Sequence, residues 1–258
     1  MSLGFNAPDT TIGWIANGGL LITKLDANDN PVGGYFNVGQ ASSAVLALSS
    51  DKVEMQDMVY GTLGVAKSKI IKNSAELTIN LKSFSPEVME LALFGKVTED
   101  IAETGATARA KAYKGRSIIV EGIIAAVTSV KITGDEDMLV AGDDYIVSNG
   151  SIFFPGTSSV IDGDEVDVVY DKVAVRRIEG MVNTGVNVGI IFDGVNLAES
   201  DTPVKVSYHK VSLSPAAQRQ LLSSDYADQE IKGTLLVSKA VIGSGLSKMF
   251  KEEHVVAV

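Results

Sequence analysis

The two histidines are the first residues to weigh for chemistry, because imidazole serves as a general base and as a metal ligand near neutral pH. His209 lies on the polar side of a strand-like segment, and His254 follows two glutamates in the C-terminal segment. Both positions are typical of surface or interface histidines. A Ser–His–acid triad would have to use one of them, so a hydrolase without a recognisable motif remains the enzyme alternative.

Other catalytic groups are missing from the 258 residues. The absence of cysteine excludes disulfides, thiolate zinc sites and cysteine nucleophiles. The nucleophile-elbow, phosphate-loop, dinucleotide-binding and zinc-protease motifs are absent too. We therefore expect no enzymatic activity, no catalytic residue, no cofactor and no bound metal.

Acidic clusters at residues 134–137, 142–144 and 162–165 offer oxygen atoms of the kind that bind calcium. None of the three has the spacing of a calcium loop, and Asp and Gly are also the residues that exposed turns favour. We interpret the clusters as solvated turns and keep ion binding as the alternative. A sugar-cleaving carboxylate pair is not expected, because Trp14 is the only Trp and a sugar groove is rich in aromatic residues.

The chain has 22 basic and 32 acidic residues, a net charge of −10, which argues against nonspecific electrostatic binding to the phosphate backbone of nucleic acids. Residues 118–178 hold 11 acidic and 4 basic residues, a net −7, whereas residues 101–117 are basic. From that basic segment we expect Arg109, Lys111, Lys114 and Arg116 to contact acidic loops of neighbouring subunits.

Alternation of apolar and polar residues is the main structural signal. It predicts strands at 75–82, 165–171 and 186–192, and another at 204–213 with a bulge where the alternation slips near His209 and Lys210. Asn149-Gly150 predicts a hairpin with a type I′ turn, and segments 20–26 and 35–40 predict a second hairpin. Strands with one polar face indicate antiparallel sheets.

Two Ser-Pro pairs mark helix starts. Ser85 caps a helix that begins at Pro86 and ends with Gly95 at the C′ position, and Ser214-Pro215 begins a shorter helix. The predicted fold is therefore mostly β: an antiparallel β-sandwich or barrel with one main α-helix, a short second helix and an inserted β-meander.

The order of these elements resembles that of the bacteriophage major tail tube proteins. The matching features are an opening hairpin at 19–39, a long connection at 51–69, the strand at 75–81, the helix at 86–95 and closing strands at 204–215 and 231–237. The resemblance covers roughly residues 10–117 and 179–245.

This resemblance implies a structural virion protein in the phage tail, assembled in the host cytoplasm. Subunits of the family form six-membered rings that stack into a hollow tube with other tail proteins, and DNA passes through the lumen without specific binding. No cofactor is implied. Neither a secretory signal nor a membrane-spanning segment is expected from the sequence. A β-sandwich adhesin that binds its ligand as a monomer remains the alternative.

Two domains are expected: a tail-tube-like β domain of residues 1–117 and 179–258, and an inserted acidic β-meander of residues 118–178. The alternative is one continuous sandwich. Because an acidic, self-contained insert belongs most simply on an outer surface, we expect it to be dispensable for tube formation.

The connection at 49–73 is the expected assembly element, because its apolar residues have no evident partner within the domain. The candidate inter-subunit contacts there are Met55, Met58, Val59, Tyr60, Leu63 and Val65. The alternative is an ordinary long hairpin on its own sheet. The candidate lumen or interface faces are the polar rows Glu76, Thr78, Asn80 and Lys82, and Lys205, Ser207 and His209.

Overall fold

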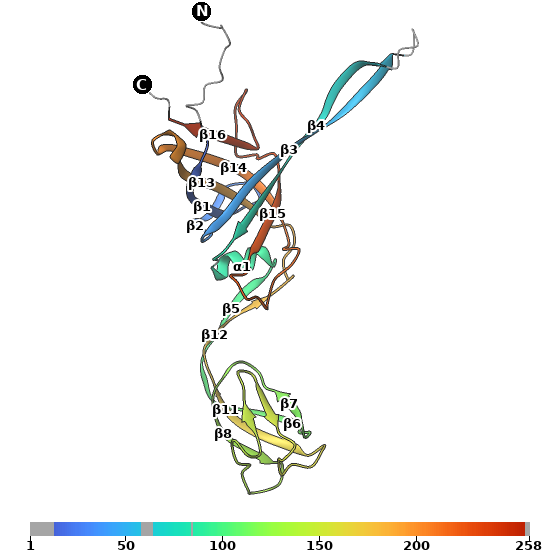
Figure 1. Cartoon of the computed structure of the whole chain (residues 1–258), viewed down its shortest axis with the longest axis vertical. Helices are drawn as coiled ribbons and strands as arrows, with labels where there is room; N and C mark the ends of the chain where they lie inside the picture. Colours follow the sequence, from blue (N-terminus) through green and yellow to red (C-terminus); the bar gives the residue numbers. More distant parts are fainter. Residues whose placement is uncertain (1–12, 58–63, 84, 256–258) are drawn as a thin grey trace, which may run out of the picture. The chain divides into compact units, whose positions relative to one another are not determined.

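The structure is a computed structural model that describes residues 13–57, 64–83 and 85–255 (Figure 1). The chain divides into two compact units: unit 1 contains Met1–Lys96 and Ile178–Val258, and unit 2 contains Val97–Arg177. Each unit has its own hydrophobic core. Unit 2 begins at Val97 and ends at Arg177, whereas the sequence predicts an insert of residues 118–178.

Unit 1 is built on one eight-stranded antiparallel sheet in the order β2-β1-β13-β14-β15-β4-β3, with β16 also pairing with β14. Its strands are β1 (Ala16–Leu25), β2 (Pro31–Asn37), β3 (Ala41–Asp57), β4 (Gly64–Leu81), β13 (Asn187–Asn196), β14 (Thr202–Ser214), β15 (Gln229–Leu235) and β16 (Phe250–His254). In the last part of β4, which includes the residues that pair with β15, alternate residues are buried, as in Ala75, Leu77, Ile79 and Leu81.

Helix α1 (Pro86–Ala92) contributes Val88, Leu91 and Ala92 to the core of unit 1. The predicted start is confirmed, since the Val88 amide donates to the Ser85 hydroxyl at 3.3 Å. The predicted end is wrong, because Phe94 and not Gly95 adopts the left-handed conformation, with φ of 50°. Gly95 is needed for close approach instead: a Cβ there would lie 2.9 Å from the Glu179 carbonyl oxygen.

The short second helix predicted after Ser214 is also wrong. Residues 215–222 are irregular, and Leu221 and Leu222 are 79% and 91% exposed. A short helix needs tertiary packing of an apolar face, which these side chains do not have. The bulge predicted in β14 is confirmed, because Tyr208 pairs with Ile190 whereas Val211 pairs with Val188. A single 3-10 turn, η1 (Leu197–Glu199), lies between β13 and β14.

Unit 2 is a β-sandwich of two three-stranded antiparallel sheets. One contains β6 (Glu103–Lys111), β11 (Glu165–Lys172) and β8 (Ile124–Ile132), and the other contains β7 (Arg116–Ile119), β10 (Ser151–Phe154) and β9 (Ile146–Val147). Val168 and Tyr170 from the first sheet share a core with Ile152 and Phe154 from the second. The predicted β-rich, antiparallel fold is thus confirmed.

The first boundary of the insert lies at residue 97 rather than 118. Strand β6 pairs with β11 from Lys111↔Glu165 to Glu103↔Lys172, so residues 103–111 belong to the sandwich of unit 2. The chain enters and leaves unit 2 through β5 (Lys96–Asp100) and β12 (Val175–Glu179), which pair with each other.

The predicted hairpin at Asn149-Gly150 is confirmed, but the predicted turn type is wrong, since neither residue has a positive φ. The carbonyls of Asn149 and Gly150 accept hydrogen bonds from the amides of Ile124 and Val120. These contacts with the neighbouring segment decide the turn conformation in place of the local Asn-Gly preference.

Candidate assembly interface

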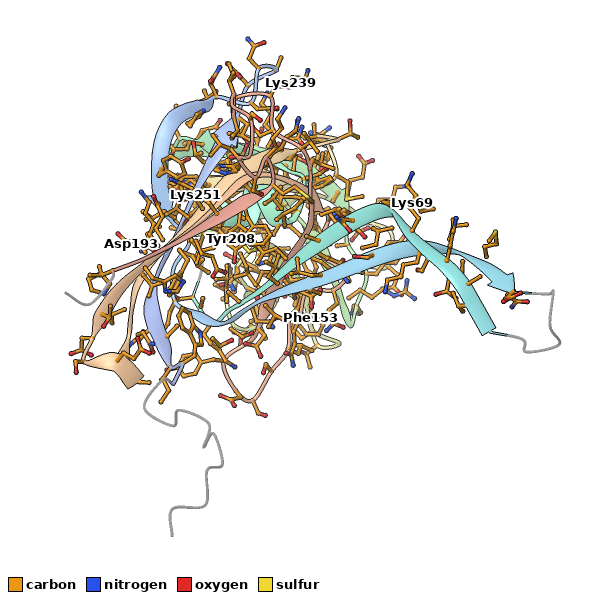
Figure 2. The ribbon with its side chains drawn as sticks, turned by 90° about the horizontal axis from the view of Figure 1, so that it is seen from above. Lys69, Phe153, Asp193, Tyr208, Lys239 and Lys251 are labelled. Carbon is orange, nitrogen blue, oxygen red and sulfur yellow. The ribbon has the colours of Figure 1, made fainter. Side chains whose placement is uncertain are left out.

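A two-stranded ribbon projects from the sheet of unit 1 (Figure 1). Strands β3 and β4 pair all the way to Asp57↔Gly64, but β15 covers β4 only from Glu76 to Leu81. We call residues 50–57 and 64–73 the arm. Figure 2 shows Lys69 on its β4 strand, outside the body of the unit.

Every residue of the arm except Asp57 is exposed. The apolar ones include Val53, Met55, Val65, Ile70 and Ile71, which are 52–62% exposed. An isolated two-stranded hairpin is only marginally stable in water. Exposed apolar side chains and unpaired strand edges are features of a surface that another chain covers. The arm therefore has the properties of an interaction element.

The candidate contacts in the 49–73 connection fall into two groups. Met55 and Val65 lie on the arm. Met58, Val59, Tyr60 and Leu63 lie outside the described residues. The connection is a hairpin over its described part, as in the alternative interpretation, but its outer half extends beyond the sheet.

Other exposed residues of the arm were not among the predicted contacts: Val53, Lys67, Lys69, Ile70, Ile71 and Lys72. The sequence could have indicated the lysines among them, because residues 64–73 contain three lysines and no acidic residue, a local excess of positive charge.

The polar row of β4 lies on the face opposite the core. Glu76 forms an ion pair with Lys232 of β15 at 2.8 Å, and Lys82 pairs with Asp228 at 2.9 Å. The contact with Asp228 raises the pKa of Lys82. Of the two uncharged members, Thr78 is half-buried, and the Asn80 amide donates to Ser43 at 3.0 Å. The row is a polar surface whose charges are largely compensated within its own sheet.

The second polar row, on β14, is less exposed than expected. Lys205 is exposed, but Ser207 is buried and His209 is half-buried. Burial and the nearby Lys251 lower the pKa of His209, so the ring is neutral at physiological pH. A neutral imidazole between lysines adds no positive charge to this face.

The two predicted arginine contacts lie in unit 2. Arg109 binds Asp167 on the neighbouring strand through two bonds, Nε–Oδ1 at 2.6 Å and Nη2–Oδ2 at 3.2 Å, and this contact lowers the pKa of the carboxyl. The Arg116 guanidinium lies 5.7 Å from the centre of the Tyr113 ring. Arg109 is therefore already paired within its own sheet, and the inter-subunit role of both arginines stays a prediction.

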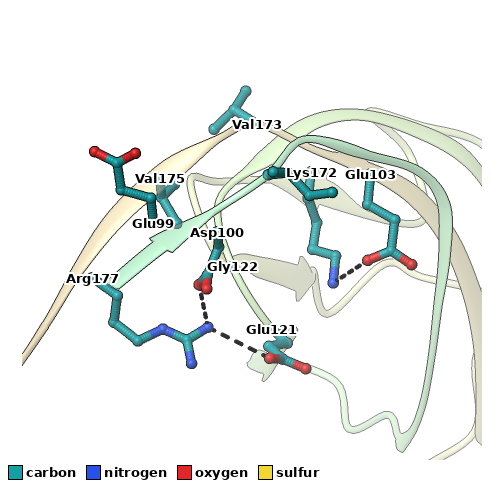
Figure 3. A pocket seen from close by; sticks show the side chains of 10 residues that line it. Glu99, Asp100, Glu103, Glu121, Gly122, Lys172, Val173, Val175 and Arg177 are labelled. Carbon is teal, nitrogen blue, oxygen red and sulfur yellow. Dashed lines mark ion pairs between the residues drawn. The ribbon is translucent and has the colours of Figure 1, made fainter. Parts of the chain in front are cut away.

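A polar surface pocket of about 380 Å³ lies in unit 2 (Figure 3). Arg177 lies between Asp100 and Glu121, at 2.6 and 3.6 Å. Lys172 pairs with Glu103 at 2.7 Å. The described lining residues include no Ser, Thr, Cys or His. The pocket therefore holds ion pairs and lacks a nucleophile–base pair.

Aspartates of the acidic clusters stabilise turns. Asp144 accepts from the amides of Val140 and Ser159 at 2.9 and 2.8 Å, and these bonds lower its pKa. Asp164 accepts from the Ile161 amide at 2.8 Å. Within the described ranges, no group of three or more Asp, Glu, His or Cys is placed to hold a metal ion.

We expect the intact protein not to bind duplex DNA at physiological salt. Its net charge is −10, and basic residues on the sheet faces, Lys82, Arg109 and Lys232, are paired with acids. An electrophoretic mobility assay with free duplex DNA checks this, with the isolated chain and any assembled form measured separately. A mobility shift that weakens as salt is added would contradict the expectation.

No helix in the described part of the chain is long and apolar enough to cross a membrane.

Comparison with known proteins places the chain in one family. The family model described as "Protein of unknown function UCP028589" matches residues 14–252, so the chain belongs to this family. A search of curated proteins finds no match. The description of this family assigns no activity.

Proposed function

We propose that this member of the family is a structural subunit of a phage tail tube, which assembles into six-membered rings that stack into a hollow tube for DNA delivery. The observation that carries the proposal is the arm, which exposes strand edges and apolar side chains that the subunit itself does not cover. A second copy of the chain is the partner that a self-assembling subunit always has available.

The sheet of unit 1 also supports this role. Its last strands, β2 and β3, are edges, and joining subunits edge to edge removes the exposed edges that an isolated sheet carries. The compensated row of Glu76, Thr78, Asn80 and Lys82 is suited to a lumen, because it presents no uncompensated basic cluster at which DNA would pause.

The proposal is tested with the full-length purified chain. Sedimentation velocity over a range of protein concentrations, followed by negative-stain electron microscopy, is expected to reveal rings or tubes. A monomer at every concentration would contradict the proposal. A monomer that binds a surface ligand would support the adhesin alternative.

Removing unit 2 is expected to leave assembly intact. Unit 2 has its own core, and its two chain connections run side by side in β5 and β12. The variant joins Lys96 to Ile178 through a short Gly/Ser linker, because a cut at residue 118 would leave β6 without its partner β11. Electron microscopy of the variant is expected to show rings or tubes like those of the full chain. A folded variant that stays monomeric would contradict the prediction.

A further inference from the structure

Among the described residues, the outer edges of both strands of the arm have no strand partner. Strand β3 is the last strand of its sheet along its whole length. Strand β4 pairs with β15 only from Glu76 onward, so among the described residues its second edge has no strand partner over 64–75. A free edge presents unpaired amides and carbonyls, which makes each side of the arm able to accept a further strand.

The two edges carry opposite charge. The β4 side, residues 64–73, contains Lys67, Lys69 and Lys72 and no acidic residue. The β3 side, residues 50–57, contains three acids and Lys52. Those acids are Asp51, Glu54 and Asp57.

A bulge places the three lysines on one face. Lys69 and Lys67 pair with Val53 and Met55, which lie on the same face because side chains alternate along a strand. Lys72 pairs with Asp51, again on this face, although its sequence position has the opposite parity. Ile71 is the extra residue that shifts the phase.

Charge distinguishes the ways in which two arms can meet. Pairing β4 with β4 sets lysines against lysines, and pairing β3 with β3 sets acids against acids. Pairing β4 with the neighbour's β3 sets the lysines beside Asp51 and Asp57, the acids of β3 on the same face, and opposite charges side by side stabilise a strand pair. Repulsion between like charges therefore disfavours the β4–β4 and β3–β3 arrangements.

We propose that the arms of successive copies pair edge to edge and antiparallel, β4 of one copy with β3 of the next, and that the opposite charges of the two edges select this head-to-tail order. The neighbour's β3 then runs parallel to the copy's own β3, so the contact joins two different edges and no two-fold axis relates the two copies. Such a heterologous contact generates rings or tubes, whereas the like-with-like contacts would stop at dimers. The inference rests on the proposed function in taking a second copy of the chain as the partner.

Charge reversal tests the proposal with the full-length chain. One variant carries Asp51→Lys, Glu54→Lys and Asp57→Lys, and the other carries Lys67→Glu, Lys69→Glu and Lys72→Glu. Each variant alone has two edges of like charge, so we expect its assembled fraction in sedimentation velocity to fall at least tenfold below that of the unmodified chain. An equimolar mixture is expected to recover assembly, because the two variants can alternate.

Two further variants serve as controls for the effect of charge reversal. A chain with all six substitutions has both edges exchanged, and it is expected to assemble alone. The matched control carries Lys131→Glu, Arg219→Glu and Lys248→Glu, which lie outside the arm. It changes the net charge equally with the lysine variant and is expected to leave assembly unchanged. Circular dichroism and melting temperature establish that each variant is folded, as the exposure of the arm predicts.

The outcomes separate the two proposals. Failure of the unmodified chain to assemble overturns both the proposed function and the edge pairing. If the unmodified chain assembles, normal assembly of either triple arm variant alone overturns the edge pairing and leaves the proposed function standing. Absence of recovery both in the mixture and in the sixfold variant overturns the edge pairing as well.

Discussion

A chain in which Asn-Gly replaces residues 50–73 is expected to fold normally and to remain monomeric. Ser49 and Ser74 are cross-strand partners whose hydroxyl oxygens lie 2.8 Å apart, so a two-residue turn can close the shortened hairpin between them. The first buried core residue of β4 is Ala75, beyond the cut. The truncation therefore removes the exposed ribbon and leaves the packed half of the hairpin.

The expected loss of assembly follows from the surface that is removed. The truncation removes the two edges of the arm and its exposed apolar residues, and the remainder of unit 1 keeps its complete core. Sedimentation velocity should place the truncated chain at the monomer value at concentrations where the full chain is assembled, with the β signal in circular dichroism retained. The variant without unit 2, which loses a much longer segment, is the control that should still assemble. Tubes of normal length from the truncated chain would disprove the role of the arm.

Strands with one buried face were predictable from the sequence. The packed half of β4 alternates strictly because Leu77 and Ile79 face the core while Glu76 and Thr78 face away. In β14 the apolar residues also have to stay on the buried face, so the alternation of apolar and polar residues shifts by one position at the bulge, and this shift made the bulge predictable. Helix α1 was predictable at its start because Ser85 and Pro86 act locally, whereas its end depends on the chain that returns at Glu179.

From the sequence, a hairpin was only the alternative interpretation of the arm, because the arm lacks the buried face that makes a strand recognisable. Neither of its faces is buried, so no requirement separates apolar from polar residues along it. Register shifts in β4 near Ala66 and Ile71 break the period of two as well. The boundary of unit 2 was missed because β6 fills its core side with Ala106, Ala108 and Ala110, which give only a weak apolar signal.

Asp29 lies in the turn between β1 and β2, and we expect its replacement to cause the largest loss of stability among the substitutions considered. Its carboxylate is buried, with Oδ1 2.6 Å from the Lys210 ammonium and Oδ2 accepting from the Lys239 amide at 2.8 Å. The Lys210 side chain is only 14% exposed. One carboxylate thus ties the turn to β14 and to the segment after β15.

Two substitutions and their combination measure this buried pair. Asp29→Asn keeps a residue that tolerates the φ of 66° but leaves the Lys210 ammonium without its counter-charge. We expect the free energy of unfolding to fall by about 3 kcal/mol, and Lys210→Met to have a similar effect, because each leaves one buried charge unpaired. The double variant should recover part of the loss. Glu253→Gln, which breaks an exposed pair with Lys251, is the control and should leave the free energy of unfolding almost unchanged.

The pH dependence gives an independent measure of the same contact. The hydrogen bond from Lys210, followed by that from the Lys239 amide, lowers the pKa of Asp29 in the folded chain. The carboxylate therefore stabilises the fold fully above the unfolded pKa of about 3.9, and this contribution decreases as pH falls through the lower, folded pKa. Chemical unfolding at a series of pH values should show the difference between the unmodified chain and Asp29→Asn constant near neutral pH and narrowing in acid. A difference that stays constant down to the most acidic condition would mean that the charge of Asp29 contributes nothing, and that the turn conformation alone accounts for its position.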